Sequence, residues 1–237
     1  MEKKVTHTQT ILLMNINRVS IVVHFSSCII FSQWSSFHTE NMNNPDSYKT
    51  NGLAALISSS QYYPFDNEKN FHFGSSISGE ISTTRYAPHT FAFVKLTWNL
   101  ILRGRMSGFS TEEGAAQLFG WGMSLNPGSA ESPANWMVSF DSGFFRGHNQ
   151  INLSALKFSI DRFFLIDDKT KFIYGLSMNS INNSKYIYGM GFSTRSAYQI
   201  NQINTGIMRS FKDIILSLNL STNNTSNYLS FSIFRSI

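Results

Sequence analysis

The sequence predicts an all-β protein, an antiparallel up-and-down transmembrane β-barrel of about ten strands, on three observations. From Phe71 onward, large apolar residues alternate with small or polar ones, the pattern of a strand with two different faces. The alternating runs reach about 11 to 15 residues, whereas soluble strands cluster near five or six and membrane-spanning strands need about 9 to 11. Charged residues form only 14% of the chain, against roughly 25% in a soluble globular protein.

The N-terminal region is expected to be a targeting segment over 1–37 and a polar linker over 38–51, followed by the barrel over 52–237. Arg18 precedes the apolar run "VSIVVHFSSCIIF", which has the length of a signal-peptide core and is short for a spanning helix. The only cysteine, Cys28, ends "FSSC", which is similar to a lipoprotein lipidation box. Two interpretations stay open for Cys28, a lipid attachment site or a passive residue of a removed signal.

Nine runs alternate clearly, and residues 52–62 are a candidate tenth strand. Bacterial barrels have an even number of strands, so ten is expected and eight is the alternative. Ile151 and Leu153 break the alternation, which predicts a β-bulge. Residues 110–119 are interpreted as a loop, and "NSINNSK" as a turn between two strands. The expected strands are 71–81, 92–105, 119–125, 136–144, 150–164, 172–178, 186–193, 205–220 and 229–237.

The large apolar face of these strands is expected to contact lipid, with Tyr and Trp near the headgroups. The residues assigned to it are Leu96, Trp98, Trp121, Phe140, Tyr174, Tyr188, Leu216 and Phe231. The opposite face is mostly Gly and Ser and is expected to line a narrow lumen. The charged residues that fall on this face form a predicted hydrogen-bonded lumen network: Glu80, Lys95, Arg103, Asp141 and Lys157. A lipid-facing Lys or Arg at mid-depth would cost about 2 to 4 kcal/mol, which favours the lumen for them.

From about residue 70 to the end, this pattern resembles that of small bacterial outer-membrane β-barrel proteins. The final run "YLSFSIFRSI" has the alternation that the insertion machinery reads, but it ends in Ile237 where Phe or Trp is usual, and Arg235 interrupts the apolar stripe. The resemblance implies a bacterial outer-membrane location, with membrane lipid and the barrel-insertion machinery as partners. It implies a structural barrel, a narrow pore of porin-like kind, or an accessory subunit of a surface complex.

A second hypothesis remains, because alternation alone does not distinguish lipid from a second sheet. A secreted or periplasmic β-sandwich, or a soluble lipid-binding barrel, would bury the same aromatic face as its core.

No catalytic site is evident, and no cofactor or metal is expected, because the six His residues have no metal-ligand spacing. His72 near Ser76 supports only a third hypothesis, an outer-membrane lipid hydrolase. The net charge of +5 is scattered along the chain and no nucleic-acid module is recognisable, so nucleic acid is not an expected partner.

Overall fold

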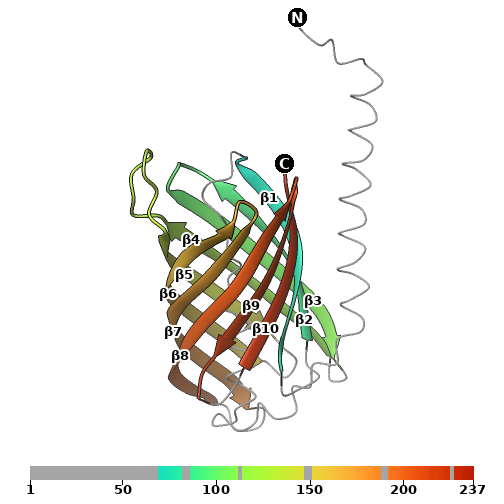
Figure 1. Cartoon of the computed structure of the whole chain (residues 1–237). Coiled ribbons are helices and arrows are strands. Elements are labelled where there is room, and N and C mark those ends of the chain that lie inside the picture. The colour runs from blue at the N-terminus through green and yellow to red at the C-terminus, as the bar shows by residue number, and fades with distance from the viewer. Residues whose placement is uncertain (1–68, 82–85, 112–113, 147–150, 188–191, 225–226) are drawn as a thin grey trace, which may run out of the picture.

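The computed structural model describes residues 69–81, 86–111, 114–146, 151–187, 192–224 and 227–237. These residues form one closed antiparallel barrel in which each strand pairs with its neighbours in sequence and β1 pairs with β10 (Figure 1). The expected fold class, an up-and-down barrel of about ten strands, is confirmed. The expected targeting segment, the linker, Cys28 and the candidate strand 52–62 lie outside the described residues.

The strands differ in length, and those on one side of the barrel are the longest. β6, β7 and β8 have 17, 18 and 20 residues, whereas β9 has nine. A strand of ten residues tilted by about 40° spans roughly 25 Å along the barrel axis, so even the shorter strands match the height of an apolar membrane band. The strands are β1 (Phe71–Glu80), β2 (Tyr86–Lys95), β3 (Leu100–Thr111), β4 (Gly114–Leu125), β5 (Trp136–Arg146), β6 (Ile151–Asp167), β7 (Thr170–Ile187), β8 (Phe192–Phe211), β9 (Ile214–Thr222) and β10 (Asn227–Ser236).

The barrel has two distinct ends. At one end β1 begins and β10 finishes, and the backbone N–H of Ile237 donates to the carbonyl of Phe71 over 3.0 Å. We call this end the terminal rim; the connections after β2, β4, β6 and β8 also lie there. The opposite end, the loop rim, carries the connections after β1, β3, β5, β7 and β9. Within the described ranges no helix is long and apolar enough to cross a membrane.

Two segments that were expected to be single strands are hairpins. Residues 92–105 contain a turn at 96–99 between β2 and β3, and residues 205–220 contain a two-residue turn between β8 and β9. The alternation continues in phase through the first turn, which hides it in the sequence. The second turn has Lys212 at a φ of 55°, the positive value that tight hairpins require at one position.

Two expected loops are strands. "NSINNSK" continues β7, so 172–178 and the start of 186–193 belong to one strand that pairs with β8 from Thr170 to Ile187. Residues 110–119 lie mostly in β3 and β4, which pair up to Thr111 and Gly114. The expected bulge near Leu153 is absent, because Leu153 faces the interior opposite Phe145 in a continuous register. The register of β6 shifts between Leu165 and Asp167 instead.

The interior at the terminal rim is filled with apolar side chains, which we call the apolar layer. Phe91, Phe93 and Phe234 pack with ring centroids 5.1 to 5.8 Å apart, in tilted and edge-on arrangements. Each member lies within five residues of its strand's end at this rim. Such burial stabilises the folded chain by both apolar transfer and close packing. The members are Phe91, Phe93, Ile101, Met137, Ile173, Met208, Ile215 and Phe234.

Phe234 and Phe231 provide a matched test of this layer, because they lie on one strand and face opposite sides. Phe234→Ala should lower the free energy of unfolding by about 3 to 5 kcal/mol, since it removes apolar burial and leaves a cavity. Phe231→Ala should cost clearly less, because Phe231 is 47% exposed on the outer wall and no closed cavity remains. Denaturant titration of each variant in phospholipid vesicles measures both values. Equal losses would contradict the packed interior.

Candidate functional site: the barrel interior

A belt of polar side chains fills the barrel interior beyond the apolar layer. Its charged members are almost entirely buried: Arg103 is 8% exposed, Asp141 3%, Lys157 4% and Asp161 0%. Burying charges is favourable only where ion pairs and hydrogen bonds replace water, so the contacts of the belt decide whether it is stable. We define the polar belt as Arg103, Ser124, Ser139, Asp141, Lys157, Ser159, Asp161 and Asn204.

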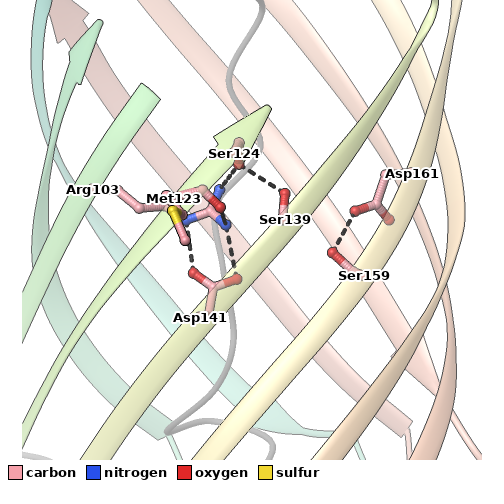
Figure 2. A network of polar contacts seen from close by, with 7 residues as sticks. All are labelled: Arg103, Met123, Ser124, Ser139, Asp141, Ser159 and Asp161. Carbon is pink, nitrogen blue, oxygen red and sulfur yellow. Dashed lines mark hydrogen bonds and ion pairs between the residues drawn. The ribbon is translucent and has the colours of Figure 1, made fainter. Parts of the chain in front are cut away.

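The ion pair between Arg103 and Asp141 is the strongest contact in the belt. Arg103 Nε donates to Asp141 Oδ1 over 2.7 Å and Nη2 donates to Oδ2 over 2.8 Å, a two-pronged geometry that favours this pair. Arg103 Nη1 donates to Ser124 Oγ over 2.7 Å, and that hydroxyl is 2.7 Å from Ser139 Oγ (Figure 2). The guanidinium and both carboxylate oxygens therefore find partners inside the wall.

A glycine makes this ion pair possible. Arg103 is on β3 and Asp141 on β5, and the residue between them on β4 is Gly122, paired in register with both. A Cβ at Gly122 would collide with Asp141 Oδ1 and stand 2.8 Å from Arg103 Nε. Because position 122 has no side chain, the two charges can meet across the intervening strand.

The same arrangement recurs on the next three strands of the wall, β6 to β8. Asp161 on β6 and Asn204 on β8 lie on either side of Gly175 on β7, and Asn204 Nδ2 reaches Asp161 Oδ1 at 3.5 Å. A Cβ at Gly175 would collide with the same Asp161 oxygen. Ser159 Oγ donates to the other Asp161 oxygen over 2.8 Å (Figure 2). Inward-facing glycines therefore alternate around the wall with the polar groups that need their space.

A second set of apolar side chains lies beyond the belt toward the loop rim. Leu118, Phe145 and Leu153 are neighbours in register on β4, β5 and β6, and each is at most 3% exposed. Ile181 on β7 is paired with Ala155 and is fully buried. The belt is thus enclosed between two apolar regions.

The structure brings together three of the five charged residues predicted to share the lumen. Arg103 and Asp141 form the ion pair, and Lys157 is the register neighbour of Asp141 on β6. Glu80 faces the interior at the loop-rim end of β1, and Lys95 ends β2 at the terminal rim, so both lie away from the belt. The predicted network did not include Asp161 and Asn204, although each lies on the same face of its strand as the small residues.

The residues assigned to the outer face occupy different environments. Trp121, Tyr174 and Phe231 are exposed on the outer wall at 51%, 39% and 47%. Phe140 and Leu216 are half-buried on the same wall, where Phe140 packs against Trp121 at a centroid distance of 6.0 Å. The remaining three do not lie in described strands: Leu96 and Trp98 are exposed in the turn 96–99, and Tyr188 is outside the described residues.

The histidine and serine residues considered for hydrolysis do not form the expected pair. His72 Nε2 is hydrogen-bonded to the carbonyl of Lys69, whereas Ser76 is hydrogen-bonded to His89. Ser76 and His89 are 4% and 2% exposed inside the barrel, so lipid outside the wall does not reach them. Among the described side chains, no three His, Cys, Asp or Glu residues gather in a way that could hold a metal ion.

Known proteins resemble this chain only distantly. No protein-family model matches the chain, and no curated protein matches it. The solved structures similar to it include the KdgM porin in complex with disordered oligogalacturonate, at 6% identity and a TM-score of 0.37 over 71% of this chain and 99% of that one. The N-terminal β-barrel domain of Pseudomonas aeruginosa OprF matches at 9% and 0.32, over 71% and 98%. Ail, the attachment invasion locus protein of Yersinia pestis, matches at 7% and 0.31, over 71% and 96%.

The closed wall, the apolar outer face and the polar interior define the class of the protein. Large apolar side chains on the outside of the barrel are exposed on every strand from β1 to β10, while Arg103 and Asp141 form an ion pair within. A sheet that closes on itself leaves no unpaired edge, which is the condition for crossing lipid with strands. The chain therefore has the closed-barrel fold and the two-faced wall that are typical of outer-membrane β-barrels.

Gly122→Ala tests the crossing of the ion pair over β4. The new methyl group should force Arg103 and Asp141 apart and lower the free energy of unfolding by about 3 to 5 kcal/mol, the range for a broken buried pair. Gly104→Ala is the control, because a Cβ there meets nothing within 4 Å, and its effect should stay within about 1 kcal/mol. Denaturant titration in vesicles measures both. If Gly122→Ala were as stable as the wild type, the pair would not depend on the glycine.

Proposed function

We propose that the protein is an outer-membrane barrel with a sealed interior, which acts as a structural element or as an accessory subunit of a surface assembly. The observation that carries this proposal is the near-complete burial of the charged belt, whose charged members are at most 8% exposed. A water-filled channel would leave its lining charges accessible to solvent, as in porin-type barrels.

The packing on both sides of the belt supports the same conclusion. Phe234 and Ile173 in the apolar layer are fully buried, and Ile181 toward the loop rim is fully buried as well. An ion that followed the barrel axis would have to displace these side chains and break the Arg103–Asp141 pair. The narrow-pore hypothesis therefore requires a rearrangement of the interior, and the structural hypothesis requires none.

The outer wall supports a membrane location for this barrel. Leu176 is 66% exposed and Met106 65%, and neither has a second sheet covering it within the described chain. A soluble sandwich would bury such side chains against a second sheet, whereas a bilayer covers them with lipid. The partners that follow from this proposal are membrane lipid and the machinery that inserts barrels.

Conductance measurements test the sealed interior. The refolded full-length chain, inserted into planar bilayers, should show no regular current steps above the bare membrane, because a sealed belt would leave no continuous water path. Protease protection of the same sample in vesicles verifies that the barrel has inserted. Reproducible steps of one unit size from inserted protein would overturn the sealed barrel and favour the narrow pore.

A further inference from the structure

The outer wall carries an apolar groove that crosses the strands β5 to β8 and reaches the end of β9. Its volume is about 1080 Å³, at the upper end of the roughly 300 to 1,000 Å³ of ligand pockets in proteins. Its floor is formed by side chains on the outward face of β6 and β7, including Phe158, Ile160, Leu176 and Met178. The groove therefore lies on the side of the wall that faces the membrane.

Among the described residues that line this groove, Arg162 is the one with a charge. Its guanidinium carbon lies 5.0 Å from the ring centroid of Phe164, within the range of a cation–π contact. Phe164 in turn stacks on Tyr174, with centroids 5.2 Å apart and an angle of 14° between the rings. Trp136 and Tyr174 are the register neighbours of Arg162 on β5 and β7. The contact with Phe164 therefore favours a position of the Arg162 guanidinium close to the outer wall.

The outer wall has an uneven charge pattern. Among the strand side chains that the structure describes, the outward-facing cations are all arginines. The one carboxylate exposed beside them is that of Asp167, the last residue of β6. Arg162, Arg209 and Arg235 lie in the halves of β6, β8 and β10 nearer the terminal rim, and Arg209 also packs over an aromatic ring, that of Phe211, at 5.3 Å. Arg146 lies at the loop rim. The described part of the wall can therefore neutralise an anion, and its one outward carboxylate, Asp167, stands at the terminal rim.

We propose that the groove binds one anionic phospholipid, with its phosphate at Arg162 and an acyl chain along Ile160, Leu176 and Ile203. Arg is suited to this role because its planar fork matches phosphate oxygens, and an aromatic neighbour limits its motion. A zwitterionic lipid would bring an ammonium group, and none of the described residues that line the groove offers it a carboxylate. This inference rests on the proposed membrane location, since only a barrel in a bilayer would meet such a ligand.

Native mass spectrometry of the full-length barrel in detergent tests the lipid site. The barrel is mixed with equal amounts of dioleoyl-phosphatidylglycerol and dioleoyl-phosphatidylethanolamine, and the lipids retained per barrel are counted. The wild type should retain one phosphatidylglycerol in preference to phosphatidylethanolamine. Arg162→Gln should weaken that retention about fivefold, the effect expected of one basic residue at an anionic lipid surface. Arg146→Gln, at the other rim, should retain the lipid as the wild type does.

A second variant keeps the test decisive if Arg162→Gln does not fold. Leu176→Trp fills the groove and leaves Arg162 in place, so it should also lower phosphatidylglycerol retention. Equal retention of the two lipids by the wild type, or unchanged retention in both Arg162→Gln and Leu176→Trp, would overturn the lipid site. A wild type that forms no barrel in detergent would instead contradict the membrane location, so the two failures are distinguishable.

Discussion

The pairing of β1 with β10 is the constraint on which the rest of the structure depends. Nine register pairs from His72 to Glu80 join the first strand to the last, so no sheet edge remains to be hydrated. In lipid, where water cannot satisfy a free N–H or carbonyl, each unpaired group would cost several kcal/mol. Closure also divides every strand into one inward and one outward face, and this division sets the two environments that the side chains must suit.

Glycines on the inward face leave room for the polar side chains of the interior. A barrel of ten strands has a narrow interior, and a side chain at every inward position would overfill it. Arg103 meets Asp141 over Gly122, and Asp161 meets Asn204 over Gly175. Gly122 and Gly175 thus allow polar side chains on alternate strands to contact one another across the strand between them. The buried ion pair and the close filling of the interior are two consequences of this arrangement.

The outward face needs no such precision, because lipid adapts to its shape. Its specific feature is the distribution of charge. Arginines such as Arg162 and Arg209 lie over aromatic rings, and the carboxylates of the described strands are confined to the interior and the rims. Long cationic side chains can extend toward phosphates while their stems stay in apolar surroundings. The proposed lipid site would combine these two properties, an apolar wall and a localised positive charge.

The sequence was sufficient to predict the barrel and the side of the wall on which Arg103, Asp141 and Lys157 lie, because a period of two fixes the face of each residue. It was insufficient at the turns. The turn 96–99 preserves the alternation between Val94 and Leu100, and no Gly or Pro marks it, so two strands look like one. The break in phase between Phe211 and Ile214 did mark the other hidden turn.

The apolar layer could not be predicted for a different reason. Phe93, Met137 and Phe234 stand on the face that carries small and polar residues elsewhere, and alternation alone does not reveal where along the axis the interior changes from apolar to polar. That change depends on how the strands are staggered, which the sequence of one strand does not contain. The partnership of Asp161 with Asn204 is hidden likewise, since 43 residues separate them.

Electrophoretic mobility of the full-length chain before and after boiling tests most directly the claim that a closed barrel spans lipid. The chain is refolded in detergent and compared with a sample kept in aqueous buffer. A compact band in the unboiled detergent sample that moves to the unfolded position on boiling, together with aggregation in buffer, is the predicted result. A monomer that stays soluble without detergent and shows one mobility under both conditions would contradict it, because the outer face would then be covered by protein.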